Sequence, residues 1–451
     1  MLHYSKYNHI VQIDDDTWFL YNFYTGNATT LDFISKAMFD MALTLDPKQP
    51  KIKSFIENHF LVDYDELEVL KKYIYANYEN KDNLDITIIP TFDCNFKCPY
   101  CFEEARPGLM PKEVQDDLIR FIENIFIKNK TKRLLVTWFG GEPLIAIDLI
   151  HDLYKRINAL CIKYGVKTYI SHMVSNGYLL NQRVADILNE CKVSMIQITL
   201  DGPSAKIHDK TRFLRNGQGT FDRIINNLKT IKLDAKIKIR CNVQKDNLAS
   251  YKDLVKLVDE IREESHNNII IYPGYLNGNV TAADKEGGFE DKDLGFENFS
   301  LSVKDLLTSV PMYSHRNTYC SAQSKYGFAV DEKGDMYKCW EKLSYYETSF
   351  GNIRNFDFDD IENNKILKDY ESVLLPKDEK CLDCKLLPAC KGGCPSKRLR
   401  KIPRCLEASY DLDAYLRLIY KQIYIDKKAE WWNRRRKDQK FSRKIFEYLR
   451  I

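Results

Sequence analysis

Three cysteines lie close together in a short segment that could bind a metal cluster. Cys94, Cys98 and Cys101 form a C-x3-C-x2-C pattern just after the apolar run 84–89, which is typical of a β-strand. Three thiolates in one loop can hold three irons of a [4Fe–4S] cube, whose full ligation usually takes four cysteines. The fourth iron is then free to chelate a small molecule. The alternative is a zinc site that takes a further ligand from elsewhere in the chain.

Glycine-rich and polar motifs follow three further strand-like runs. They are Gly140-Gly141-Glu142-Pro143 after the run 134–139, Ser175-Asn176 after 168–174, and Thr199 at the end of 194–200. Two glycines after a strand let a ligand approach the backbone closely. Because α/β sheets bind ligands at the carboxyl ends of their parallel strands, we expect these motifs and the cysteine triplet to lie at one edge of a sheet.

This combination resembles the radical SAM superfamily. The cysteine spacing, with the aromatic Tyr100 before the last cysteine, is that family's cluster motif, and Gly140 to Pro143 corresponds to its GGEP motif. The resemblance implies that the amine and carboxylate of S-adenosylmethionine (SAM) chelate the open iron. An electron from the cluster then cleaves SAM to a 5′-deoxyadenosyl radical, which abstracts a substrate hydrogen. The protein positions the cofactor and excludes water.

The same resemblance implies which residues contact SAM. They are Tyr100, Gly140, Gly141, Glu142, Pro143, Ser175, Asn176, Thr199 and Arg212. Thr199 stands where relatives often carry serine. The sequence identifies no catalytic base: Glu103 and Glu104 follow the cysteine triplet, but charged residues in a loop are usually just solvated.

Seven further cysteines form a second set between residues 320 and 405. Taken alone, the set would suit two four-ligand zinc sites. Beside the triplet, it resembles the SPASM domain, which holds two auxiliary [4Fe–4S] clusters, so that three clusters are expected in all. The resemblance implies that Cys320, Cys339 and Cys394 hold the cluster nearer the active site. It implies that the farther cluster is held by Cys381, Cys384, Cys390 and Cys405.

Two residues depart from the pattern of sulfatase-maturing relatives. Those enzymes carry an eighth cysteine where this chain has Tyr326, and an aspartate where it has Trp340. Tyr326 leaves the nearer cluster with three protein thiolates and an iron that a substrate thiolate could bind. Trp340 cannot accept a proton. Both departures favour peptide cross-linking over sulfatase maturation.

Composition excludes several classes of protein. The 451 residues suffice for two or three domains with a sizeable core. The formal net charge of +4 gives no general electrostatic reason to bind nucleic acid. No stretch approaches the roughly 18 apolar residues that span a membrane, and no signal peptide is recognisable. Thirteen cysteines without a secretion signal favour metal ligation in a reducing cytoplasm over disulfides.

Residues 1–80 are predicted to form a separate unit of short strands followed by helices. The expected strands are 10–13, 18–21 and 29–32, and the expected helices are 33–45, 51–59 and 65–78. This order resembles the winged-helix peptide-recognition element of peptide-modifying enzymes, which adds a leader peptide to the edge of its sheet. The alternative is a structural cap over the edge of a barrel.

Residues 84–300 alternate strands with helices, which predicts an α/β fold with a mostly parallel sheet. The expected strands are 84–89, 134–139, 168–174, 194–200, 237–243 and 268–272, with helices such as 111–127, 144–161 and 221–231. The six repeats agree with the partial (β/α)6 barrel that the family resemblance implies. The predicted SPASM domain then occupies residues 310–410.

Residues 411–451 are predicted to form a basic C-terminal helix. From Lys421 onward, eleven Lys and Arg residues stand against four Asp and Glu residues. Such a segment suits contact with an acidic peptide or protein. The alternative is a solvated helix anchored by its aromatic residues.

Together these features predict a cytoplasmic radical SAM enzyme with a SPASM domain that oxidatively modifies a ribosomally made precursor peptide. The product is expected to carry a thioether, ether or carbon–carbon link, and the resemblance implies an electron donor such as flavodoxin or ferredoxin. One alternative is an anaerobic sulfatase-maturing enzyme that forms formylglycine. The other, from a different class, is a zinc-stabilised binding protein without catalysis.

Overall fold

The computed structural model divides into two compact units. It describes residues 1–244, 246–275, 312–315, 320–343, 345–356, 363–401, 405–409 and 411–425. One unit combines Met1–Asn77, Gly295–Thr318 and Val373–Ile451, and the other combines Tyr78–Leu294 and Tyr319–Ser372. These units do not follow the segments 1–80, 84–300, 310–410 and 411–451 one for one. The assignment of those segments to functional domains stays a prediction.

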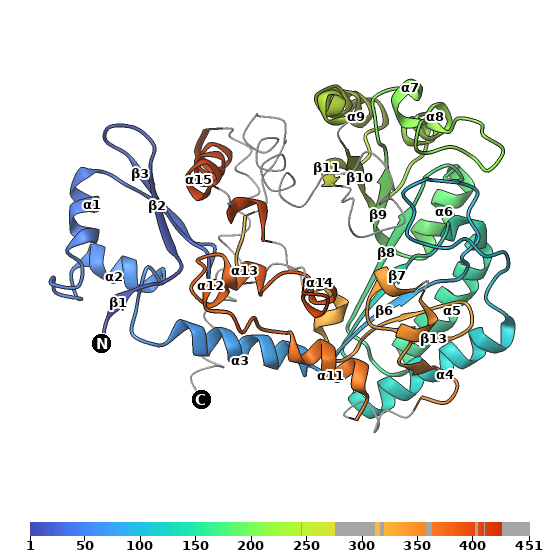
Figure 1. Ribbon diagram of the computed structural model, residues 1–451, viewed down its shortest axis with the longest axis horizontal. Coiled ribbons are helices and arrows are strands. Elements are labelled where there is room, and N and C mark those ends of the chain that lie inside the picture. The colour runs from blue at the N-terminus through green and yellow to red at the C-terminus, as the bar shows by residue number, and fades with distance from the viewer. Residues whose placement is uncertain are drawn as a thin grey trace. The chain divides into compact units, whose positions relative to one another are not determined.

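The second unit is built on a parallel sheet (Figure 1). Its parallel strands are β6 Asn83–Ile88, β7 Arg133–Trp138, β8 Thr168–Ser175, β9 Val193–Thr199, β10 Lys236–Val243 and β11 Ile269–Tyr275. All neighbours in this series pair in parallel. The predicted strands and the α/β class are therefore confirmed, with differences only at the strand ends.

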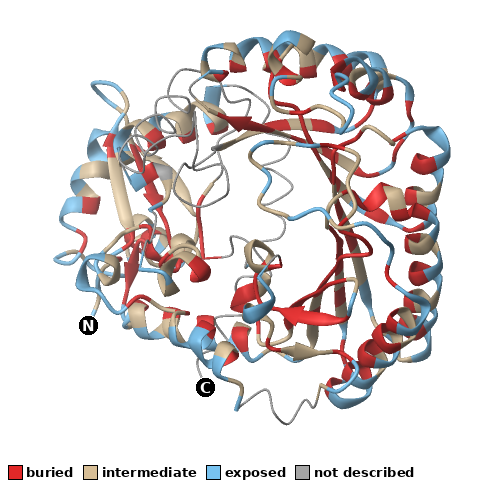
Figure 2. Cartoon of the chain, turned by 45° about the vertical axis from the view of Figure 1, so that its right-hand side comes forward, coloured by how far each residue is buried: buried red, intermediate tan, exposed pale blue. Residues whose placement is uncertain are grey.

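Helices connect successive strands of this sheet. They are α4 Lys112–Asn129, η1 Pro143–Ala146, α5 Ile147–Lys163, α6 Gln182–Glu190, α7 Ala205–His208, α8 Phe221–Thr230, η2 Leu248–Ser250 and α9 Tyr251–Ser265. Figure 2 shows the long helices of this unit with their buried residues turned towards the sheet. Trp138, Met173, Ile196 and Ile237 lie in one register row across the sheet and are fully buried. These apolar side chains stabilise the layer in proportion to the area they remove from water.

The sheet continues beyond β6 with strands from the predicted SPASM segment. β12 Gly327–Val330 pairs in parallel with β6, and β13 Asp335–Tyr337 and β14 Gly351–Asn352 continue the sheet in antiparallel order. The short helices of this region are η3 Ser321–Gln323, η4 Trp340–Lys342, η5 Tyr346–Thr348 and α11 Lys365–Ser372. Part of the predicted SPASM segment therefore extends the sheet that carries the cysteine triplet.

The first unit begins with a small antiparallel sheet and helices. The sheet has the order β2-β3-β4, and a two-stranded pair joins β1 to β5. The elements are β1 His3–Tyr4, β2 Asn8–Gln12, β3 Trp18–Asn22, β4 Ala28–Leu31, α1 Phe33–Asp40, α2 Pro50–Glu57, β5 Leu61–Val62 and α3 Glu66–Tyr78. Leu20, Leu31, Phe39, Phe55 and Phe60 form the core between sheet and helices.

One predicted boundary in this sheet-and-helix segment is wrong. The helix expected over 33–45 begins as predicted, because Asp32 accepts a hydrogen bond from the Ser35 backbone N–H at 2.7 Å. It ends at Asp40, and a series of turns follows. The Thr44 hydroxyl donates to the Met41 carbonyl at 2.8 Å, a local bond that competes with continued helix. The winged-helix assignment stays a prediction.

The C-terminal part of the first unit consists of short helices and one longer helix. They are α12 Glu379–Leu382, α13 Leu387–Cys390, α14 Pro395–Leu399, η7 Glu407–Ser409, α15 Leu412–Tyr420 and η8 Lys421–Ile425. The helix predicted after residue 411 is confirmed up to Ile425, and it packs on the small sheet through Phe19 and Tyr420, whose rings lie 5.6 Å apart. The basic run beyond 425 lies outside the described residues. No helix in the described part of the chain has the length and apolarity to cross a bilayer.

Candidate active site

The loop after β6 carries the cysteine triplet and is fastened to the segment that follows β9. Phe96 and Leu214 form an antiparallel bridge. The Lys97 N–H donates to the Phe213 carbonyl at 3.0 Å, and the Arg215 N–H donates to the Asn95 carbonyl at 3.1 Å. These backbone bonds fix the loop that holds the three thiols.

The three thiols lie close enough to influence one another's ionisation. Burial and the charge of Glu142 raise the pKa of the Cys94 thiol to about 12, and Cys98 and Cys101 add to the rise. Burial also raises the pKa of Cys101 to about 11. Thiols whose pKa is raised in this way ionise readily only when a cation binds them, because a metal ion deprotonates the thiols that coordinate it. The triplet therefore fits a cationic group with several metal sites.

The protein also provides a hydrogen bond to one of these sulfurs. The Phe96 N–H donates to Cys94 Sγ at 3.4 Å. Such bonds tune the clusters that cysteines hold. Among the described residues, no three Cys, His, Asp or Glu side chains surround a single metal-ion position. The cysteines of a cube bind different irons, so the predicted ligand sets stay predictions.

The two glycines after β7 lie against the cysteine loop. Gly140 has φ +120°, and a Cβ there would meet the Thr91 carbonyl oxygen and the Ile89 side chain. A Cβ on Gly141 would meet the carbonyl oxygens of Phe92 and Asp93. Only glycine therefore allows this approach, which brings the GGEP motif beside the cysteines.

Glu142 connects the segments that follow β6, β7 and β8 through hydrogen bonds. Its backbone N–H donates to the Asp93 carbonyl at 2.9 Å. Its carboxylate is fully buried and accepts from Leu144 N at 3.0 Å, Ser175 Oγ at 2.8 Å and Asn176 N at 2.7 Å. Burial raises the pKa of this carboxyl, and these hydrogen bonds oppose the rise. The motifs after β6, β7 and β8 are thus held together around one carboxylate.

Tyr100 is the centre of a second network at the same edge. Its hydroxyl donates to Asp201, and it accepts from Arg212 Nη1 at 2.9 Å and Asn242 Nδ2 at 3.2 Å. The Asn242 N–H donates in turn to Asp201 Oδ1 at 2.9 Å. Thr199 is buried at the end of β9 beside this network. The cysteine loop is therefore joined to the ends of β9 and β10.

Asp201 and Asn242 are functional candidates that the sequence reasoning missed. Both are buried polar residues at the carboxyl end of a predicted strand, a signal that was present in the sequence. His208 is buried and accepts from the Asp201 N–H at 3.1 Å. Burial and then Arg212 hold its pKa well below the usual range, so His208 is a neutral structural residue.

Two buried donors at this edge have no hydrogen-bond partner among the described residues. They are Asn95 Nδ2 and Arg212 Nε. Burial opposes the charge of Arg212, but Tyr100, Cys98 and Asp201 raise its pKa overall. A buried donor without a partner is costly, so both atoms suit a bound ligand with acceptor oxygens. The carboxylate and ribose of SAM would provide such acceptors.

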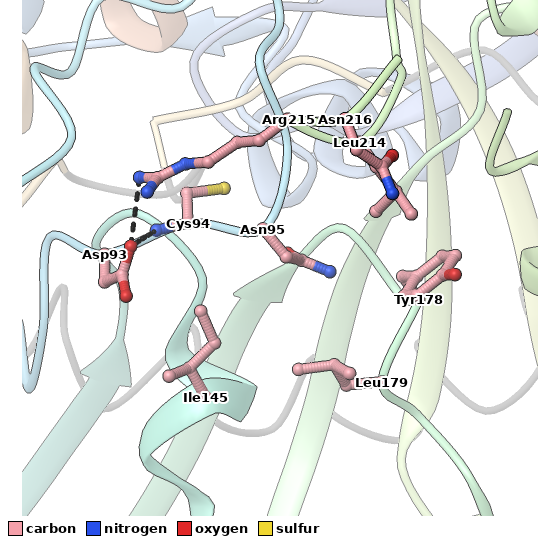
Figure 3. Close-up of a pocket in the computed structure, with 9 residues that line it drawn as sticks. All are labelled: Asp93, Cys94, Asn95, Ile145, Tyr178, Leu179, Leu214, Arg215 and Asn216. Carbon is pink, nitrogen blue, oxygen red and sulfur yellow. Dashed lines mark hydrogen bonds and ion pairs between the residues drawn. The ribbon is translucent and has the colours of Figure 1, made fainter. Parts of the chain in front are cut away.

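A cavity of about 420 Å³ opens beside the first cysteine. Figure 3 shows the Cys94 thiol and the Asn95 amide extending towards the space enclosed by Ile145, Tyr178 and Leu179. At its rim Arg215 forms an ion pair with Asp93 at 2.9 Å. Polar residues such as Asp93 and Asn95 and apolar residues such as Ile145 and Leu179 line this cavity.

A comparison with known protein families identifies a domain in this part of the chain. Residues 88–258 match the model of the Radical SAM superfamily. The chain contains a radical SAM domain. The cysteine triplet, the GGEP motif and Arg212 all lie within the matched residues.

Similar proteins extend beyond this domain. A cysteine-type anaerobic sulfatase-maturating enzyme of Clostridium novyi (strain NT) is 25% identical over 351 residues, which cover 69% of this chain and 87% of that protein. The radical SAM cyclopropyl synthase TigE of Paramaledivibacter caminithermalis is 21% identical over 340 residues, which cover 68% of this chain and 67% of TigE.

A solved structure shares the fold. The structure of native anSMEcpe with bound AdoMet and Kp18Cys peptide superposes with a TM-score of 0.58 at 19% identity, covering 76% of this chain and 98% of that one. It supports the fold of the radical SAM domain. When bound, the cluster and SAM supply the radical chemistry. The thiol loop, the GGEP loop and Arg212 are the parts of this chain that would hold these groups.

The seven cysteines expected to hold the auxiliary clusters are divided between the two units. Cys320 and Cys339 belong to the second unit, and the other five belong to the first. Burial and Asp378 raise the pKa of Cys381 to about 11, and Cys390 and Cys405 add to the rise. Burial also raises the pKa of Cys390, again with Cys405 and Cys384 contributing. The four cysteines expected for the farther cluster therefore all belong to the first unit.

Tyr100→Phe is expected to weaken SAM binding by about tenfold. The change removes the hydroxyl that Asp201, Arg212 and Asn242 share. It leaves buried polar groups without a hydrogen-bond partner, at a free-energy cost of about 1–2 kcal/mol. Anaerobic equilibrium dialysis with SAM measures the affinity. Tyr164→Phe is the matched control, because its hydroxyl bonds Glu123 on the outer helices, and unchanged SAM affinity in Tyr100→Phe contradicts a positioning role.

Proposed function

We propose that this radical SAM enzyme oxidatively modifies a ribosomally synthesised precursor peptide. The expected product carries a thioether, ether or carbon–carbon link, and SPASM clusters take up the electron that is left after hydrogen abstraction. A donor such as flavodoxin or ferredoxin supplies the electron that cleaves SAM. Three clusters are expected, at Cys94, Cys98 and Cys101 and at the two auxiliary cysteine sets.

The observation that carries this proposal is the small sheet of the first unit. The antiparallel strands β2, β3 and β4 are followed by the helices α1, α2 and α3. β4 is the last strand of this sheet, and a strand at a sheet edge can pair with an extended peptide. This arrangement suits recognition of a leader segment. The peptide bound in the anSMEcpe structure supports a peptide substrate for the shared fold.

Formylglycine formation on a sulfatase is the second candidate. The cysteine-type sulfatase-maturating enzymes among the relatives favour it. Trp340 weighs against it, because its ring packs on Phe139 with centroids 4.8 Å apart and an indole cannot accept a proton. Tyr326 stands where those enzymes carry a cysteine.

The test is the mass of candidate peptides after anaerobic co-expression. Short open reading frames beside the gene are expressed one at a time with the enzyme. We expect one peptide to lose two hydrogen atoms for each link formed, and fragmentation then locates the bond. The Cys94→Ala enzyme is the control and should leave the mass unchanged.

Other results separate the two candidates. If no neighbouring peptide changes and a cysteine-containing sulfatase peptide gains formylglycine, the second candidate replaces the first. A mass change that persists with Cys94→Ala contradicts radical SAM catalysis of the modification. If neither kind of substrate changes, the peptide proposal is wrong.

A further inference from the structure

One face of the parallel sheet carries mostly polar side chains in rows across β8, β9 and β10, with Met195 and Val174 among them. Register partners on neighbouring strands point to the same face, and residues two apart on one strand do so as well. One row joins Thr137, His172, Met195 and Lys236, the next joins Val174, Gln197 and Lys238, and the third joins Thr199, Arg240 and Tyr272. This polar face is half-buried rather than closed.

The opposite face shows that this polarity is not a general feature of the sheet. Ile237, Ile239 and Cys241, which alternate with the polar residues of β10, are buried almost completely. In a closed barrel, branched apolar side chains would fill the interior face. Here β10 presents Lys236, Lys238 and Arg240 to that face instead. We call these three residues the β10 cation row.

The β10 cation row has no acidic partner in the described part of the chain. Salt bridges there engage Arg133 with Asp85 at 3.1 Å, but no carboxylate of a described residue pairs with Lys236, Lys238 or Arg240. Burial and then Lys236 lower the pKa of Lys238. Burial, Lys238 and Arg133 lower the pKa of His172 on the neighbouring strand. Lys236 and Lys238 thus repel each other on a half-buried surface, a cost that an anion would remove.

Arg240 is held at the end of the row nearest the predicted SAM site. Its Nε donates to Asn242 Oδ1 at 2.9 Å, and Asn242 donates to the Tyr100 hydroxyl. Gly274 on β11 makes room for the guanidinium, because a Cβ there would lie 2.8 Å from Arg240 Cζ. The row therefore runs along the sheet face up to the edge where Tyr100 and the cysteine triplet lie.

We propose that the β10 cation row binds a carboxylate of the substrate peptide, either an Asp or Glu side chain or a free C-terminus. The inference rests on the proposed function and deepens it, since it names the chemistry of the segment beside the modified residue. Charge-assisted hydrogen bonds from Lys and Arg to carboxylate are strong and directional. Bound in this way, the carboxylate positions its neighbouring residue near the SAM edge.

The test uses the reconstituted full-length enzyme with SAM under anaerobic conditions. The probe is a synthetic library of random ten-residue peptides with acetylated N-termini, half with amidated and half with free C-termini. Peptides retained by the tagged enzyme are sequenced by mass spectrometry. We expect peptides with Asp or Glu, or with a free C-terminus, to be enriched by about tenfold over the input. The amidated half separates the two sources of carboxylate.

Variants test whether the β10 cation row causes the enrichment of acidic peptides. Lys238→Gln should reduce the acidic enrichment to background, and Arg240→Gln provides a second variant should Lys238→Gln be poorly folded. Lys256→Gln on α9 is the matched control, because its side chain is 64% exposed on an outer helix. SAM affinity and iron content of each variant report whether the fold and the SAM site are intact.

Four results overturn the inference. Acidic enrichment that persists in both Lys238→Gln and Arg240→Gln means that other residues bind the carboxylate. Peptides retained without acidic preference refute the inference and leave the proposed function standing. Retention of no peptide refutes it together with peptide binding by this radical SAM domain. A loss of SAM affinity in Lys238→Gln equal to the loss of peptide enrichment assigns the row to the SAM carboxylate instead.

Discussion

Replacing Cys94, Cys98 and Cys101 together by alanine is expected to abolish reductive cleavage of SAM. The three thiols share one loop after β6, in which the Cys101 N–H donates to the Cys98 carbonyl at 3.1 Å. Without them, no cluster can pass an electron to SAM at this edge of the sheet. Anaerobic assays with dithionite measure 5′-deoxyadenosine, which should not exceed the enzyme-free background.

The iron and acid-labile sulfide contents of the triple variant report the loss of its cluster independently of activity. The three proposed cubes would give about twelve irons per chain, and loss of one cube would leave about eight. The auxiliary cysteines lie in other segments, so their clusters should persist in the triple variant. Zinc in place of iron in the wild-type protein would instead support the zinc-stabilised binding protein.

Cys161→Ala is the matched control for the triple variant. Cys161 is buried on α5, where burial raises the pKa of its thiol to about 11, and it belongs to no cysteine motif. A buried cysteine of this kind behaves as a small apolar residue. SAM cleavage and iron content should therefore stay at the wild-type level. Cleavage that survives in the triple variant would refute the assignment of the triplet.

The parallel sheet was predictable because its signal is local. Four of the six predicted strands are short runs that end at a motif, as 134–139 does before Gly140. Parallel connectivity then places the motifs at one edge without any knowledge of contacts. The structure brings together Gly141, Glu142, Ser175 and Asn176 as this reasoning expects.

The contacts that hold the site together were not predictable, because they depend on register between strands far apart in the chain. Asn242 reaches the Tyr100 hydroxyl only because β9 and β10 pair as they do. No local sequence pattern predicts that pairing. The same holds for β12, whose pairing with β6 joins residues more than two hundred positions apart. The helix end at Asp40 was missed for a smaller reason, the local bond of Thr44.

Glu142→Gln is expected to destabilise the radical SAM domain and to weaken SAM binding by about tenfold. The carboxylate accepts from Leu144 N–H and Ser175 Oγ on one oxygen and from Asn176 N–H on the other. A glutamine has a single acceptor oxygen, and its NH₂ group must face at least one of these donors. A buried donor left without an acceptor costs about 1–3 kcal/mol.

The loss in SAM affinity follows from what these donors position. The Asn176 backbone and Ser175 lie at the end of β8, and the Glu142 backbone holds the GGEP loop against Asp93. Movement at either end displaces the residues expected to contact SAM. Anaerobic calorimetry gives the melting temperature, which should fall by several degrees for a domain of this size. Equilibrium dialysis gives the SAM affinity.

Glu190→Gln separates this effect from the loss of a charge alone. Glu190 is 64% exposed at the end of α6 and pairs with His151 at 2.8 Å. Exposed ion pairs contribute little, so this variant should keep its melting temperature and its affinity for SAM. If Glu142→Gln keeps its melting temperature and its SAM affinity as Glu190→Gln does, the Glu142 carboxylate does not hold together the motifs at the carboxyl ends of the strands. If only the melting temperature falls, Glu142 supports the fold while the SAM contacts form independently of it.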